Sequence, residues 1–80
     1  MARFLLHHRH EPHECGVAFA AWKGHDSALR GQDTFGTCRA GGHEIWWLVD
    51  ADTAEEALDL VPYFIAQRTT VARIDRIAIP

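Results

Sequence analysis

Imidazole and thiol side chains gather in one short stretch near the N-terminus. The chain has six histidines, and four of them fall within residues 7–13, followed by a cysteine at position 15. Imidazole nitrogen and thiolate sulfur are the ligands that suit zinc, nickel and copper. We therefore expect a transition-metal site (Ni, Zn or Cu) with ligands drawn from His8, His10, His13 and Cys15, completed by Glu11 or Glu14.

The spacing of these residues matches no motif with a fixed mechanism, such as CxxC or HExxH. Strand alternation would put His8 and His10 on one face, with their Cα atoms about 7 Å apart. Structural roles remain open for each residue. Cys15 shares a helical stripe with apolar residues and could be an inert core thiol. His8 could be a hydrogen-bonded core histidine, and His13 a solvated residue of a first helical turn.

A second polar set is expected on the opposite sheet face, where a small anionic or aromatic ligand could bind. Its residues are His7, Arg9, Arg39 and Trp46, beside Glu44, with His25 in a loop that could close over either site. The alternative for this face is a polar dimer interface with ion pairs. No G-x-S-x-G elbow or glycine-rich phosphate loop is present, so we expect a binding protein rather than an enzyme.

These side chains must be positioned by a small set of predicted elements. Strands are expected at 2–10, 34–40, 43–50 and 69–79, and helices at 12–23 and from 52 to 61. A β-α-β-β-α-β order with right-handed crossovers gives a four-stranded antiparallel sheet with two helices on one face. The sequence thus predicts an α+β, ferredoxin-like fold in a single domain over residues 1–80. A phase change between Ile74 and Ile77 indicates a break or bulge in the last strand.

The pair Gly41-Gly42 predicts a two-residue hairpin turn. In that register Arg39 opposes Glu44 and Gly36 opposes Trp47. The sheet face that the helices cover would carry Gly36, Cys38, Ile45, Trp47 and Val49. The other face would carry Leu5, Phe35, Trp46 and Leu48, an apolar patch that predicts a homodimer. The alternative is that the C-terminal strand or the 24–33 loop folds over this patch.

Composition excludes several classes of protein. The net charge is −3 and the basic residues are scattered, which argues against nucleic-acid binding. The N-terminal apolar run is too short for a signal peptide, and no stretch is long enough to span a bilayer. Two cysteines are too few for a disulfide scaffold. We expect a cytoplasmic protein with reduced thiols.

Three features resemble small bacterial ferredoxin-like proteins of the dimeric α+β-barrel type. They are an N-terminal strand ending in histidines, the Gly-Gly hairpin into His43-Glu44-Ile45-Trp46, and the acid-capped helix from Asp52. The chain looks in particular like short actinobacterial proteins of unknown function, one branch of which is described as nickel-binding. The resemblance implies a dimer and supports a metal site at His7, His8, His10 or His13. The same type includes monooxygenases, whose catalytic residues do not map onto this sequence.

Three hypotheses follow. The first is a metal-binding protein that uses the histidine-rich junction between the first strand and the first helix. The second is a small-molecule-binding or monooxygenase-like dimer. The third is a protein interaction domain without a ligand.

Overall fold

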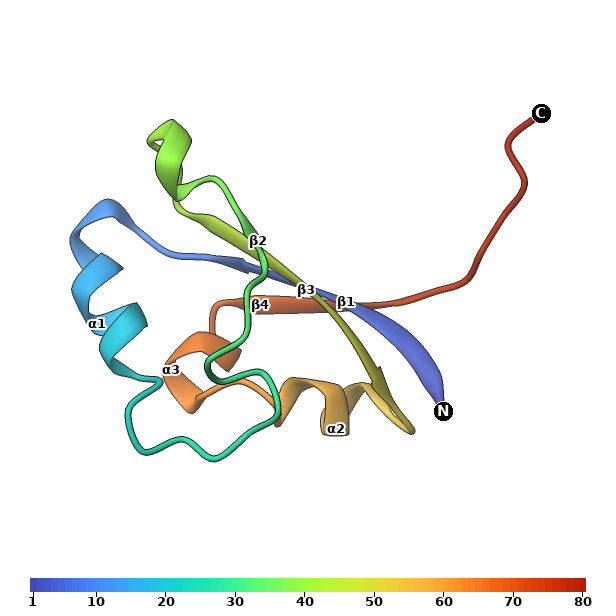
Figure 1. The fold of residues 1–80 in the computed structure, drawn as a ribbon, viewed down its shortest axis with the longest axis horizontal. Helices are drawn as coiled ribbons and strands as arrows, with labels where there is room; N and C mark the ends of the chain where they lie inside the picture. Colours follow the sequence, from blue (N-terminus) through green and yellow to red (C-terminus); the bar gives the residue numbers. More distant parts are fainter.

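A four-stranded antiparallel sheet with a few short helices along one side makes up the computed structural model, which describes residues 1–80 (Figure 1). The strands are β1 (Ala2–Arg9), β2 (Phe35–Gly36), β3 (Glu44–Ala51) and β4 (Thr69–Ile74). The helices are α1 (Cys15–Ala20), α2 (Ala54–Leu58) and α3 (Tyr63–Ala66), with 3₁₀ turns η1 (Pro12–Glu14) and η2 (Cys38–Ala40). The predicted α+β class and antiparallel sheet are confirmed.

The sheet order is β2-β3-β1-β4, so β1 is a central strand. It pairs with β3 from Ala2↔Ala51 to Arg9↔Glu44, and with β4 along its other edge. Because β1 and β3 are antiparallel, the end of β1 lies beside the start of β3. Residues that follow β1 therefore meet residues that precede β3.

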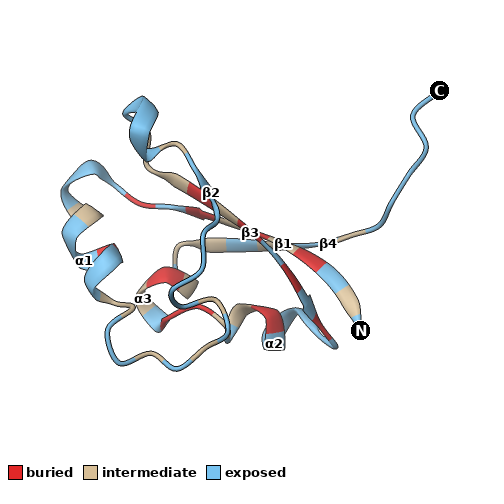
Figure 2. Ribbon diagram, viewed as in Figure 1, coloured by how far each residue is buried: buried red, intermediate tan, exposed pale blue.

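The core lies between the sheet and the helices (Figure 2). Alternation along β1 and β3 points one set of side chains to the helices, as predicted. Leu6 is fully buried at the centre, and the indoles of Trp22 and Trp47 pack 5.7 Å apart between ring centroids. The other core residues are Phe4, Ala18, Ile45, Val49, Ala51, Ala57, Val61 and Ile65.

The predicted register of the Gly41-Gly42 hairpin is wrong. Phe35 pairs with Trp46 and Gly36 pairs with Ile45, a shift of two residues that keeps each side chain on its predicted face. The chain leaves the sheet after β2 and makes the turn η2 in place of the expected strand over 34–40. Consequently Arg39 does not oppose Glu44.

Thr37 explains this longer connection. Its hydroxyl accepts a hydrogen bond from the backbone N–H of Glu44 at 3.1 Å, and its carbonyl accepts one from the N–H of Gly42 at 2.9 Å. A Cβ atom on Gly42 would collide with the Thr37 side chain, so a glycine is required there. Gly41 has a φ of 83° and ends η2 in the left-handed region.

The helices are shorter than predicted. The expected helix over 12–23 starts as η1 and its α-helical part ends at Ala20. The predicted N-cap of the next helix is confirmed, because the Thr53 hydroxyl accepts from the backbone N–H of Glu56 at 3.1 Å. The reciprocal bond of a capping box is shifted by one residue, since the Glu56 carboxylate accepts from the backbone N–H of Asp52 at 3.3 Å. Pro62 separates α2 from α3, and β4 ends at Ile74, where the apolar phase changes. Residues after β4 extend away from the sheet (Figure 1).

Candidate metal centre

Three potential metal ligands converge where β1 ends, α1 begins and β3 starts. They are His10, Cys15 and His43, and their ligand atoms all lie within 4.8 Å of one another. Cys15 Sγ is 3.1 Å from His43 Nδ1. The rings of His10 and His43 meet edge to face, with centroids 5.5 Å apart. This group could hold a metal ion.

The backbone fixes the three positions. The N–H of His10 donates to the carbonyl of His43 at 3.1 Å, which extends the β1–β3 pairing by one residue. Pro12 then opens η1 and reverses the chain, because proline suits a first helical position. Cys15 follows as the first residue of α1. All three ligands therefore lie on or beside regular structure.

An ion pair holds this junction against α3. Arg68 Nε donates to Glu14 Oε2 at 3.0 Å, and the Arg68 guanidinium lies 3.7 Å from the centre of the Phe64 ring. Glu14 also accepts from the backbone N–H of Glu11 at 2.9 Å. The pKa of Glu14 is lowered by its backbone hydrogen bond at Glu11 and then by Arg68, which favours the carboxylate. The Glu14 carboxylate thus already has partners in Glu11 and Arg68, and these contacts hold the turn η1 in position.

His10 Nε2 is the single buried side-chain nitrogen or oxygen that has no hydrogen-bond partner. Leaving such a group unpaired costs about 1–3 kcal/mol. Buried polar atoms in native proteins are nearly always paired, so an exception calls for an explanation such as an ion. His10 belongs to the His10–Cys15–His43 group, and its Nδ1 already faces His8 Nε2 at 2.9 Å. Nε2 is therefore the nitrogen of His10 that is left for a metal ion.

The protonation of His10 suits a metal ligand. Burial lowers its pKa, and the neighbouring His43 lowers it further by charge repulsion. The pKa of His8 is lowered as well, first by burial and then by His10. Both rings are therefore held in the neutral form, and a histidine must be neutral to ligate a metal.

The donor set fits a borderline divalent ion. Tetrahedral zinc with a Zn–S distance near 2.3 Å and Zn–N near 2.0–2.1 Å implies ligand atoms about 3.4–3.6 Å apart. The separations here fall at or below 4.8 Å, so adjustments of about 1 Å would close the site. A blue-copper centre would need an axial methionine or a substitute. The sole methionine is Met1, at the opposite end of β1.

The structure brings together only two of the four predicted metal ligands, His10 and Cys15. His8 is fully buried, and both its ring nitrogens have other partners: Nε2 lies 2.9 Å from His10 Nδ1, and Nδ1 lies 3.3 Å from the carbonyl oxygen of Ile65. His13 is exposed on η1 and lies outside the group.

His43 is the candidate ligand that reasoning from the sequence missed. It is far along the chain from the histidine-rich segment, which drew attention to residues near in sequence. A signal was available, because pairing the first and third strands antiparallel places the residue after one beside the residue before the other. His10 and His43 occupy those two positions.

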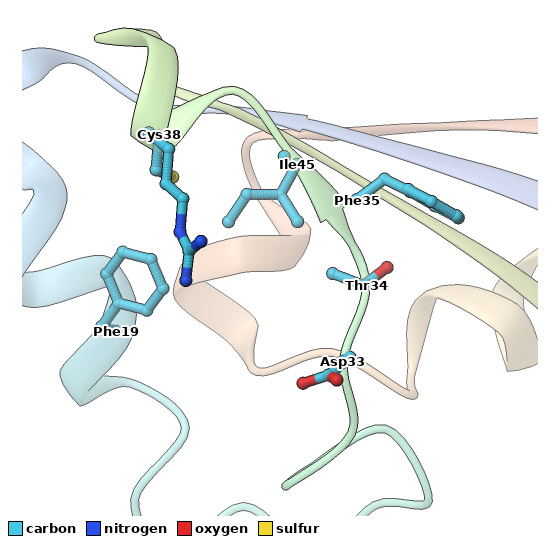
Figure 3. Close-up of a pocket in the computed structure, with 8 residues that line it drawn as sticks. Phe19, Asp33, Thr34, Phe35, Cys38 and Ile45 are labelled. Carbon is cyan, nitrogen blue, oxygen red and sulfur yellow. The ribbon is translucent and has the colours of Figure 1, made fainter.

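The second predicted set is divided: His7, Arg9 and Trp46 stay together beside Glu44, whereas Arg39 and His25 lie elsewhere. His7 stacks on Trp46 with ring centroids 4.8 Å apart and donates to Glu44 Oε1 at 2.9 Å, and Arg9 opposes Glu44 in the sheet. Arg39 instead lines a cavity of about 470 Å³ on the helix side, among residues that include Phe19, Asp33 and Cys38 (Figure 3).

His25 lies in a third place. Its Nε2 donates to the carbonyl of Leu60 at 3.2 Å, and it lines a cavity of about 620 Å³ beside α2 and α3. Within the 24–33 loop, Leu29 packs against the core. The loop is therefore fastened to the helix layer and lies over neither predicted site.

None of the helices has the length and apolar character needed to cross a membrane. Comparison of the chain with protein-family models, curated proteins and solved structures finds no match in any of the three.

Proposed function

We propose that this protein is a small metal-binding domain that holds a divalent transition metal, such as zinc or nickel, between His10, Cys15 and His43. The observation that carries the proposal is the buried, unpartnered Nε2 of His10 beside a thiol and a second imidazole. An imidazole–imidazole–thiolate set prefers such metals over magnesium or calcium, which take oxygen ligands.

Three protein ligands leave a fourth position for water or another small ligand. A polar cavity of about 440 Å³ borders two of the proposed ligands, His10 and His43. Its other walls come from Arg9, Glu11, Pro12, Gly42 and Glu44, and none of its lining residues is hydrophobic. This polar cavity supports access of an ion from solvent to the proposed centre.

Two finer proposals accompany this one. The fold is proposed to be ferredoxin-like, supported by the central position of β1 between β3 and β4 and by the helices on one side. A cytoplasmic, reducing location is supported by Cys15 and Cys38, which are both free thiols. A thiolate ligand requires such a reduced cysteine.

Isothermal titration of the reduced protein with Zn²⁺ and Ni²⁺ tests the proposal. We expect one ion per chain, and a loss of affinity in His10→Ala and in His43→Ala that exceeds the 10–100-fold typical of outer-shell changes, at about 10²-fold or more. His13→Ala is the matched control, since this exposed histidine neighbours the centre without belonging to it. Equal binding by all four proteins would refute the assignment.

The open sheet face supports a second candidate, a homodimer or small-molecule-binding protein. Phe35 and Leu48 are 75% and 52% exposed, beside the stacked pair His7 and Trp46. Exposed apolar patches commonly mark interfaces or ligand grooves. Light scattering during size exclusion would report a mass of twice 9.0 kDa for the homodimer, and a monomer at micromolar concentration would refute it.

A further inference from the structure

We infer that His8 is a positioning residue for the proposed metal centre: a buried hydrogen-bond relay from the Ile65 carbonyl through His8 presents the lone pair of His10 Nε2 to the ion. This inference rests on the proposed function and assigns a role to a residue that is not itself a ligand. Outer-shell partners of this kind orient the ring of a ligating histidine and set its tautomer.

The direction of each hydrogen bond in the relay follows from the Ile65 carbonyl, where the relay begins. The carbonyl oxygen of Ile65 can only accept, so the His8 Nδ1 that lies 3.3 Å away must carry the hydrogen. A neutral imidazole has one N–H, which leaves His8 Nε2 as an acceptor. His10 Nδ1 lies 2.9 Å from that acceptor and must donate to it. His10 Nε2 is then left with a lone pair and no hydrogen.

Thr69 gives a second reason for placing the hydrogen of His8 on Nδ1. Its hydroxyl donates to the same Ile65 carbonyl at 2.6 Å, and the hydroxyl oxygen lies 3.4 Å from His8 Nδ1. Since that hydroxyl has already donated its hydrogen, it can only accept from His8. Both neighbours of His8 Nδ1 therefore require the same tautomer.

The surroundings keep the relay in place. His8 is fully buried, and His10 is 3% exposed. The relay begins at α3, passes through β1 and ends at the proposed ligand nitrogen, so it couples the helix layer to the centre.

Two variants separate the hydrogen-bonding role of His8 from its packing role. His8→Gln retains an amide N–H for the Ile65 carbonyl and an oxygen that can accept from His10. His8→Leu fills the space without either hydrogen bond. We expect His8→Leu to bind Zn²⁺ about 10–100-fold more weakly, and His8→Gln to recover most of that loss. Far-UV circular dichroism and thermal unfolding verify that each variant is folded.

The decisive readout uses the metal-free protein. Long-range ¹H–¹⁵N correlation spectra reveal which nitrogen of His10 carries the proton. We expect Nδ1–H in the wild type and in His8→Gln, and a mixture of tautomers in His8→Leu. An Nε2–H tautomer in the wild type, or a tautomer unchanged by His8→Leu, would overturn the inference. The expected tautomers without any metal binding would refute the proposed function instead, and the relay would stand.

Discussion

His10 and His43 lie side by side across two neighbouring antiparallel strands, joined by a backbone hydrogen bond of 3.1 Å and with ring centroids 5.5 Å apart. The strand register accounts for this neighbourhood: Arg9 pairs with Glu44, so His10, which follows Arg9, lies beside His43, which precedes Glu44. The sheet thus supplies two of the three proposed ligands, and α1 supplies Cys15. A metal bound there would add a further link between β1, β3 and α1, beyond the backbone pairing of the two strands, and this has consequences for stability.

Zinc should stabilise the folded chain. The proposed site exists only when β1, β3 and α1 are assembled, so binding favours the folded state. At a free zinc concentration of 100 times Kd, the free energy of unfolding should rise by about 2.7 kcal/mol. Urea denaturation with and without zinc measures this, and a chelator should reverse it. His43→Ala should show no gain, and a gain equal to that of the wild type would place the ion elsewhere.

Metal-free stability should fall as the pH is lowered below about 6.5, the ordinary value for histidine. Burial lowers the pKa of His8 and His10 in the folded state, so below 6.5 the unfolded chain binds protons that the folded chain does not. The loss continues until the pH passes the folded pKa values and then ends. The urea midpoint between pH 8 and 5 measures this effect.

Two variants, one as the test and one as the control, check the origin of this pH dependence. His8→Gln removes one of the two buried imidazoles and should flatten the slope between pH 6.5 and 5. His13→Ala removes an exposed histidine and should leave the slope unchanged. A wild-type midpoint that is constant across this range would contradict the burial of neutral rings.

Truncations on the two faces of the sheet should differ strongly. Leu6 is fully buried under the helices, and Leu6→Ala should cost about 2–5 kcal/mol through lost burial and a residual cavity. Leu48 is 52% exposed on the other face, and Leu48→Ala should cost much less in the isolated chain. Chemical denaturation of both variants tests this. Similar costs would mean that something covers the open face in solution.

The sequence predicts the faces of this sheet better than its connections. Alternation identifies the buried residues of β1 and β3, because a side chain in a strand can take only one of two faces. The N-cap at Thr53 is a local feature, and the sequence predicts it equally well. The hairpin register depends on Thr37 folding back onto Glu44, which pattern alone does not reveal, since two glycines suit both short and longer loops.

The candidate site was also predictable only where its residues are close in sequence. His10 and Cys15 are close in sequence and were found together, whereas His43 reaches them only through strand pairing. The role of His8 depends on which atoms its two nitrogens meet, and that is settled by the packing of α3 against β1. Residue type indicated metal chemistry, and tertiary structure decided which residues could provide it.

Cobalt substitution tests the central claim most directly, because Co²⁺ takes zinc-like sites and reports its ligands by absorption. Titration of the reduced wild-type protein should give visible bands of a tetrahedral ion and a sulfur-to-cobalt charge-transfer band in the near ultraviolet, saturating at one ion per chain. Cys15→Ser should remove the charge-transfer band, His43→Ala should abolish tight binding, and Cys38→Ser should change neither. A spectrum without sulfur ligation, or one unaffected by Cys15→Ser and His43→Ala, would contradict a metal centre at His10, Cys15 and His43.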